Sequence, residues 1–233
     1  MSAFQLKLDI PRQPDLATCG PTCLQAVYQF YGDPITLDQV IHEVRSLEEG
    51  GTLAVLLASH ALERGYSATL YTYNLRIFDP TWFGLPTPEL RAKLQRRMLA
   101  KEGKKLRLAT QAYLRFIELG GQVALEDLSP ALLRYHLDRG QPILTGLSAT
   151  YLYQAPRELG VHDDDIRGDP QGHFVVLAGY DSGGERVMVA DPLGGTQWVE
   201  TSHYPVHMDR LVTAILLGVL TYDANLLILE PKA

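Results

Sequence analysis

The stretch from Gln13 to Gly32, QPDLATCGPTCLQAVYQFYG, constrains this chain most, because a proline-containing loop leads there into an amphipathic helix. Its apolar residues recur at helical spacing: Cys23, Leu24, Val27, Phe30 and Tyr31. Thr18 suits the N-cap, Pro21 is tolerated in the first turn, and Gly32 ends the helix. The pattern therefore predicts a helix that begins near Cys19.

Two interpretations of Cys19 follow from this position. The first turn of a helix offers free backbone N–H groups and the positive end of the helix dipole, which favour an anion such as a thiolate. A lone cysteine is also common as a small buried apolar residue, so the helix by itself leaves both interpretations open. Cys23 lies on the apolar stripe one turn later, and we expect it in the core.

Composition bounds the class of protein. The chain has 233 residues, 46% of them hydrophobic and 21% charged, which is enough to build a sizeable core. A formal charge of −6 argues against general nucleic-acid binding. Two cysteines on one predicted helix make no disulfide framework and favour a reducing compartment. The sequence lacks an apolar run long enough for a signal peptide or a membrane span, so we expect a cytoplasmic protein without membrane insertion.

Hydrophobic periodicity and turn residues predict a mixture of helices and strands. Further helices are expected between Thr36 and Val44, between Thr52 and Gly65, between Ser129 and Gly140, and from Met208 to Leu220. Strands are expected at residues 4–10, 66–73, 142–147, 172–181, 185–191 and 225–229. We expect one domain over residues 1–233, with no internal repeat, and the sequence predicts no particular oligomeric state.

Residues 78–122 differ in character from the rest. Two helices, at residues 89–100 and 106–119, flank a KEGKK turn, and we expect a helical insertion over the main core. Eight of the 21 basic residues lie between Arg91 and Arg107. A solvated helix surface explains this charge, and a patch for an acidic substrate or partner is the alternative.

The sequence predicts neither a metal nor a cofactor. The acidic run His162-Asp163-Asp164-Asp165 lies in an expected loop at residues 151–172. Counted from Asp163, the fifth position of a helix-loop-helix calcium site is Arg167 and the twelfth is Phe174, neither of which supplies a carboxylate. We therefore interpret the run as a solvated loop.

The two strands of the predicted hairpin bring a histidine close to a carboxylate. They are joined by Ser182-Gly183-Gly184. With this three-residue connection, Asp181 pairs with Glu185, and His173 and Asp191 become diagonal neighbours, about 7 to 8 Å apart at Cα. A two-residue turn would place them on opposite faces of the sheet, so the contact depends on the loop length.

These groups match the logic of a cysteine peptidase. A thiol at a helix N-terminus needs an imidazole to hold its proton and a carboxylate to orient that imidazole, which His173 and Asp191 can supply. Gln13, six residues before Cys19, can add a side-chain N–H to an oxyanion hole. Taken separately, His173 could be an ordinary strand histidine and Asp191 an ordinary turn residue.

Gln13-x5-Cys19-Gly-Pro-Thr-Cys23, Gly172-His173-Phe-Val-Val and Asp191-Pro192 resemble the papain-like family of bacteriocin-processing cysteine peptidases. Members cut leader peptides after a double glycine, often as a domain of an ABC exporter, and we expect a stand-alone member here. The resemblance implies an α+β fold, in which a helical half carries the nucleophile and packs on an antiparallel sheet. It also implies Cys19 as nucleophile, His173 as base and acid, Asp191 as orienting group and Gln13 as oxyanion donor.

The expected reaction is hydrolysis of a peptide or amide bond in a peptide or protein substrate. Two alternatives stay open. The same residues could transfer the acyl group to an amine, as in a transpeptidase or an amide-forming enzyme. The other alternative is a peptide-binding module without catalysis, although such a module has no need for a reactive cysteine. The insertion and the long acidic loop depart from the family pattern and leave the substrate undefined.

Overall fold

The computed structural model of the chain describes residues 4–47 and 50–232. The helices are α1 (Cys19–Phe30), α2 (Leu37–Glu43), α3 (Ala54–Glu63), α4 (Thr87–Ala100), α5 (Lys104–Glu118), α6 (Pro130–Leu137), α7 (Ala149–Tyr153) and α8 (Met208–Leu217), with short 3-10 turns η1 (Pro80–Trp82) and η2 (Gly218–Thr221). The strands are β1 (Phe4–Gln5), β2 (Tyr66–Thr72), β3 (Gln122–Ala124), β4 (Ile143–Ser148), β5 (Glu158–Leu159), β6 (His162–Asp163), β7 (Gly172–Tyr180), β8 (Arg186–Ala190), β9 (His203–His207) and β10 (Asn225–Pro231).

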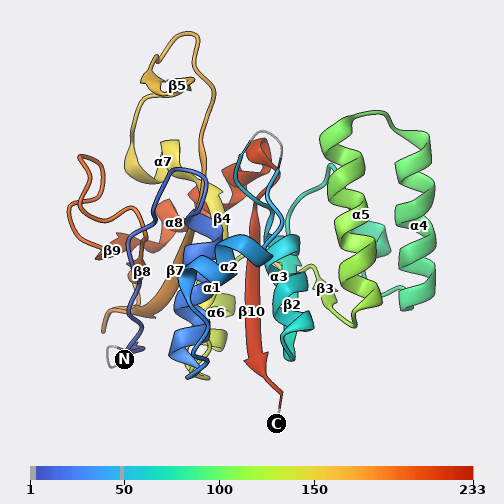
Figure 1. Cartoon of the computed structure of the whole chain (residues 1–233), viewed down its shortest axis with the longest axis horizontal. Helices are drawn as coiled ribbons and strands as arrows, with labels where there is room; N and C mark the ends of the chain where they lie inside the picture. Colours follow the sequence, from blue (N-terminus) through green and yellow to red (C-terminus); the bar gives the residue numbers. More distant parts are fainter. Residues whose placement is uncertain (1–3, 48–49, 233) are drawn as a thin grey trace.

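Among the described residues, eight strands form one sheet in the order β3-β2-β10-β4-β7-β8-β9, with β1 paired to β7. The pairings are antiparallel except for β2 with β3, which is parallel. The C-terminal strand β10 runs through the middle of the sheet, between β2 and β4 (Figure 1). The remaining strands, β5 and β6, form a separate hairpin that projects from the body (Figure 1). The expected α+β class is confirmed.

Helices cover both faces of the sheet, and each face has its own core. On one face α1, α3 and α5 pack over Leu144 and Val176, while on the other α6 and α8 pack over Val175 and Leu177. Val176 and its two neighbours on β7 are divided between the faces because strand side chains alternate. Burying each such side chain contributes about 1.5 to 3 kcal/mol. The sheet is therefore buried on both sides, which fixes the position of α1 against β7.

The helix predicted near Cys19 is confirmed as α1, which begins at that residue. Thr18 occupies the N-cap position, but its hydroxyl does not cap the helix and instead bonds to the backbone of Asp15. Cys23 is fully buried, as expected, and its thiol donates to the carbonyl oxygen of Phe174 at 3.2 Å. This bond ties the first turns of α1 to β7.

The pairing expected at the hairpin turn is wrong by one residue. The backbone N–H of Asp181 donates to the carbonyl oxygen of Arg186 at 3.0 Å, so Asp181 faces Arg186 and not Glu185. The Asp181 carboxylate accepts from the backbone N–H groups of both Glu185 and Arg186, which stabilises this longer turn.

A β-bulge on β7 corrects the register further along the hairpin. The pairing shifts between Leu177 and Gly179, where β7 contains one extra residue. Gly179 has φ +158, and a Cβ there would lie 2.3 Å from the carbonyl oxygen of Phe4, so β1 can approach β7 closely. Beyond the bulge the register is the one that the sequence predicted for His173 and Asp191.

Four segments differ from the predicted elements. The first strand ends at Gln5, and the chain leaves the sheet toward Gln13, whose backbone N–H donates to the carbonyl oxygen of Pro192 at 3.0 Å. The region expected as one long loop contains α7 and the β5–β6 hairpin. Strands β3 and β9 were not predicted, because β3 pairs with β2, which is distant in the chain, and β9 contains Pro205.

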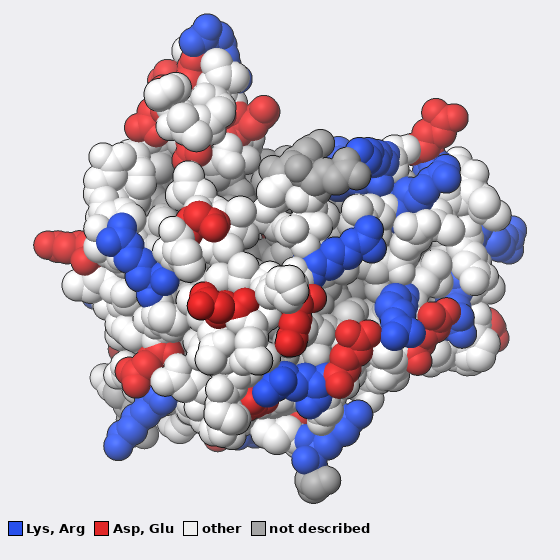
Figure 2. All heavy atoms as spheres, viewed as in Figure 1, with Lys and Arg blue, Asp and Glu red and all other residues white. Residues whose placement is uncertain are grey.

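The region expected as an insertion contains α4 and α5. Helix α5 packs on α3 and contributes Leu106, Tyr113 and Phe116 to the core. Helix α4 buries Leu90 and Leu94, and many of the Lys and Arg side chains visible in Figure 2 gather on the surface over these two helices. Within the described part of the chain, no helix is long and apolar enough to cross a membrane.

Candidate active site

Cys19 is the first residue of α1, and only 7% of its surface is exposed. The next residue, Gly20, packs so closely that a Cβ would lie 2.6 Å from Thr52 Cγ2 and 3.2 Å from Phe174 Cδ2. The first turn of α1 is thus wedged between the loop before α3 and strand β7. This contact holds the thiol where the free N–H groups of the helix begin.

His173 lies near the start of β7, and its Nε2 is 2.9 Å from Asp191 Oδ1. Both side chains are buried, with 6% of His173 and none of Asp191 exposed. The Cys19 side chain is near enough to contribute to the raised pKa of His173. Because Asp191 engages Nε2, Nδ1 is the ring nitrogen left for the thiol.

The Asp191 carboxylate accepts four hydrogen bonds. Oδ1 accepts from His173 and from the backbone N–H of Leu193 at 2.9 Å. Oδ2 accepts from the hydroxyls of Tyr153 and Tyr204, at 2.8 and 2.6 Å. A fully buried carboxylate is stable only when it is hydrogen-bonded in this way, so the four donors fix its position and its charge.

The pKa values of His173 and Asp191 follow from these surroundings. Burial lowers the pKa of His173, but the hydrogen bond and charge of Asp191, with further contributions from Cys19, raise it to about 10. Burial raises the pKa of Asp191, and the hydrogen bonds and charge of His173, with the bonds from Tyr204 and Leu193, bring it below the ordinary value. The arrangement therefore favours an imidazolium beside a carboxylate.

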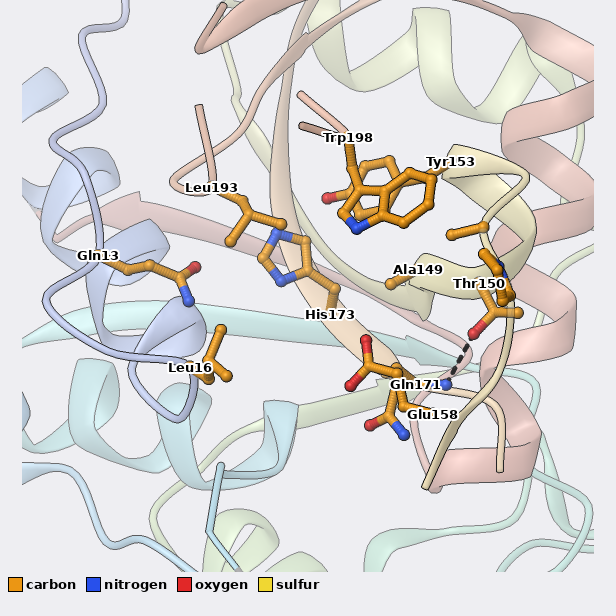
Figure 3. Close-up of a pocket in the computed structure, with 13 residues that line it drawn as sticks. Gln13, Leu16, Ala149, Thr150, Tyr153, Glu158, Gln171, His173, Leu193 and Trp198 are labelled. Atoms are coloured by element: carbon orange, nitrogen blue, oxygen red, sulfur yellow. Dashed lines mark hydrogen bonds between the residues drawn. The ribbon is translucent and has the colours of Figure 1, made fainter. Parts of the chain in front are cut away.

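Gln13 lies on the loop that leads to α1, and 8% of its surface is exposed. Its side-chain Nε2 donates to the carbonyl oxygen of Asp15 at 2.7 Å, and its Oε1 is buried without a hydrogen-bond partner. A side-chain amide has two hydrogens on nitrogen, so one N–H remains for another acceptor. Figure 3 shows the Gln13 amide directed toward His173 across the pocket that both line.

Two adjoining pockets open beside these residues, and they share Leu16, Gln171 and Gly172. The imidazole lobe, of about 130 Å³, is lined by Gln13, Tyr153, His173 and Trp198 among others (Figure 3). The thiol lobe, of about 330 Å³, is lined by Cys19, Thr52, Lys105 and Asp223 among others. Gln13, Cys19 and His173 thus line one groove made of the two lobes, and Asp191 is buried beside His173 and lines neither lobe.

The acidic run at residues 162–165 lies on the β5–β6 hairpin and the turn after it. Asp164 accepts hydrogen bonds from the backbone and side chain of Arg167, which lower its pKa. Over residues 4–47 and 50–232, no group of His, Cys, Asp and Glu side chains could hold a metal ion. The carboxylate of Asp164 is occupied by its neighbouring arginine.

Sequence reasoning missed three residues of the site. Tyr153 is on α7, in a region expected as loop, and Tyr204 is on β9, next to Pro205. Asp223 follows η2 at the entrance to β10. The alternation of Tyr204 and Val206 around Pro205 could have indicated a short edge strand, but nothing local connects either tyrosine with Asp191.

Comparison with known protein families gives one match. Residues 98–209 match the family described as Peptidase_C39 like family. The matched part contains His173 and Asp191, whereas Gln13 and Cys19 precede it. No curated protein matches this chain in sequence. The resemblance inferred from the sequence is confirmed by the family match, which supports a cysteine peptidase function.

Comparison with solved structures identifies the fold. Xylellain, a cysteine protease from Xylella fastidiosa, superposes with a TM-score of 0.52 at 13% identity, covering 100% of this chain and 87% of that one. The peptidase domain of Streptococcus ComA, a bi-functional ABC transporter involved in a quorum sensing pathway, has a TM-score of 0.47 at 12% identity, covering 97% and 99% of the two chains. A double glycine motif protease from an AMS/PCAT transporter, in complex with the leader peptide, has a TM-score of 0.47 at 14% identity, covering 100% and 99%. The expected papain-like fold is confirmed.

Proposed function

We propose that this chain, which matches the Peptidase_C39 like family over residues 98–209, hydrolyses peptide bonds with Cys19, His173, Asp191 and Gln13. One observation carries the proposal. The His173 imidazole bonds to a buried carboxylate through Nε2 at 2.9 Å, and its pKa is raised in part by the nearby Cys19, the first residue of a helix. This is the order of nucleophile, base and orienting group that covalent catalysis of acyl transfer requires.

In the proposed first step the Cys19 sulfur, having given its proton to His173, attacks the carbonyl carbon of the substrate. The resulting oxyanion lies next to the backbone N–H of Cys19 and the free side-chain N–H of Gln13. Such donors act most strongly in a site that excludes water, and losing one typically costs about 100- to 1000-fold in rate. The burial of Gln13 and Cys19 supports this role.

The imidazolium of His173 then gives its proton to the leaving amine, and the carbon–nitrogen bond breaks to leave a thioester on Cys19. In the second step His173 accepts a proton from water, whose oxygen attacks the thioester and releases the acid and the thiol. Asp191 stabilises the imidazolium in both steps without taking the proton. The raised pKa of His173 favours the charged ring that the first step needs.

Turnover of fluorogenic peptides tests the proposal, with the two cysteines as a matched pair. Cys19→Ala should abolish hydrolysis, since the nucleophile is removed. Cys23→Ala should retain it, because Cys23 is a core residue bonded to Phe174. Hydrolysis by folded Cys19→Ala protein at the wild-type rate would refute the assignment.

Two further measurements address the alternatives. Added amine nucleophiles that become acylated in preference to water would indicate an acyl-transfer enzyme with the same residues. A folded protein that binds peptides, releases no product and does not react with iodoacetamide at Cys19 would be a peptide-binding module.

A further inference from the structure

One carboxylate that lines the thiol lobe has no role in the proposed reaction. Asp223 lines this lobe, and 6% of its surface is exposed. Its Oδ2 accepts from the hydroxyl of Thr221 at 2.9 Å, while its Oδ1 has no hydrogen-bond partner. A carboxylate has about four acceptor positions, so most of the capacity of Asp223 is unused.

The backbone around this carboxylate is shaped to hold it. Tyr222 and Ala224, on either side of it, have φ of +73 and +61, a conformation that non-glycine residues seldom adopt. Glycines give it space, since a Cβ on Gly146 would lie 2.9 Å from Oδ1 and a Cβ on Gly172 would lie 2.8 Å from Oδ2. Strained residues of this kind gather at ligand sites.

The two lobes receive different halves of a substrate. The general acid must reach the leaving nitrogen, so the imidazole lobe, lined by His173, takes the residues that follow the scissile bond. The thiol lobe, lined by Cys19 without His173, takes the residues that precede it. Asp223 therefore faces the acyl half of the substrate.

Building on the proposed peptidase function, we propose that Asp223 determines specificity by accepting hydrogen bonds from a basic side chain, Lys or Arg, on the acyl side of the scissile bond. A basic group supplies both the missing donors and the charge that a buried carboxylate needs. An apolar side chain in this lobe would close it and leave Oδ1 unpartnered.

The charged neighbours of Asp223 leave room for such a partner. Burial raises its pKa to about 7, against smaller opposing effects of Thr221, Lys105 and His173. Lys105 also lines the lobe, but its Nζ lies over the Tyr222 ring, 5.2 Å from the ring centroid. A cationic side chain of the substrate would supply the hydrogen-bond donors that Asp223 lacks.

Arginine and citrulline peptides test the proposal, because the two side chains have nearly the same shape and differ in charge. Fluorogenic peptide amides carry one or the other at each position preceding the scissile bond in turn, at a pH above the pKa of Asp223. The wild-type protein should prefer arginine at one position by about 10- to 100-fold in kcat/KM, the range for a hydrogen bond to a charged group.

Asp223→Asn should bring this ratio close to one, because the neutral amide no longer offers a charge to the guanidinium, and measurable cleavage of both peptides shows that the variant is folded. Glu158→Gln, a carboxylate change in the imidazole lobe, should leave the ratio as in the wild type. If Asp223→Asn does not fold, Asp223→Ser takes its place with the same expectation.

Cleavage without an arginine preference at any position overturns this proposal and leaves the peptidase function standing. An arginine preference that survives in folded Asp223→Asn protein, or a preference for glutamate, overturns it as well. A wild-type protein that cleaves no peptide and does not react at Cys19 overturns the proposed function, and this proposal with it.

Discussion

Replacing Tyr153 and Tyr204 by phenylalanine tests how the Asp191 carboxylate is held. Each substitution removes one hydroxyl and leaves the ring in place. Because both hydroxyls donate to Oδ2, the double variant leaves that oxygen without either of its donors in a residue with no exposed surface. We expect the two single variants to have smaller effects than the pair.

The magnitude follows from the strength of hydrogen bonds to charged groups, about 1.5 to 3 kcal/mol each. One such bond corresponds to about a 10- to 100-fold change in the proton affinity of the carboxylate. Loss of the hydroxyls raises the pKa of Asp191, so the acidic limb of the kcat/KM profile should move to higher pH. The loss of activity should appear in kcat more than in KM, because the hydroxyls act through Asp191 and His173.

The double substitution should also lower the free energy of unfolding. Since the folded-state pKa of Asp191 is lowered, the stability it contributes is present above its unfolded pKa and is lost as pH falls through the folded value. The double variant should therefore lose more stability at neutral pH than in acid. Each removed donor costs about 1 to 3 kcal/mol at neutral pH.

Tyr180→Phe is the matched control, because its hydroxyl also donates to a carboxylate, Asp138 Oδ1 at 2.6 Å, away from the proposed site residues. The assay is the pH dependence of kcat and KM for one fluorogenic peptide, with unfolding by denaturant on the same proteins. A double variant that keeps the wild-type pH profile would refute the reasoning. So would a Tyr180→Phe variant whose pH profile shifts as far as that of the double variant.

Three further predictions concern charge and packing. Asp191→Asn removes the charge that raises the pKa of His173, so the alkaline limb of the pH–rate profile should move to lower pH and kcat should fall about 10²- to 10⁴-fold; an unchanged profile would contradict this. Gly20→Ala places a Cβ 2.6 Å from the nearest side-chain carbon and should lower stability by about 1 to 3 kcal/mol, with an unchanged denaturation midpoint as the contrary result. Arg64→Met, which breaks a partly exposed ion pair with Asp33, should cost about 1 kcal/mol or less, and a larger loss would show that the pair is worth more than its exposure suggests.

Local pattern predicted the elements that carry the site, because each has a strong period or cap. Helix α1 follows from its apolar stripe, and the helix expected after Thr36 is α2, whose N-terminus has a capping box of Thr36 and Gln39. Strand β7 follows from an unbroken apolar run. These features depend on residues close in the chain, which a sequence displays directly.

The contact between His173 and Asp191 was predicted from an incorrect turn. The turn is one residue longer than expected, and the bulge near Gly179 compensates for it. The bulge lies where a third strand, β1, pairs with β7. Such tertiary contacts leave no periodic signal in the sequence. The expected pairing therefore held at the site and failed at the turn.

The tyrosines on Asp191 could not be predicted for a related reason. Helix α7 has only five residues and β9 contains Pro205, so neither has the length or pattern of a typical element. Asp223 depends on backbone strain and on glycines from two other strands. Such sites are assembled from distant segments, and only the folded chain shows them together.

A peptide carrying an electrophile in place of its scissile bond tests the central claim most directly, with the labelled residue mapped by mass spectrometry. We predict one label per chain, on Cys19, at a rate that falls at least as far in His173→Ala as in Asp191→Asn. Labelling of Cys23, or labelling of Cys19 at the wild-type rate in folded His173→Ala protein, would contradict the pairing of this thiol with this imidazole.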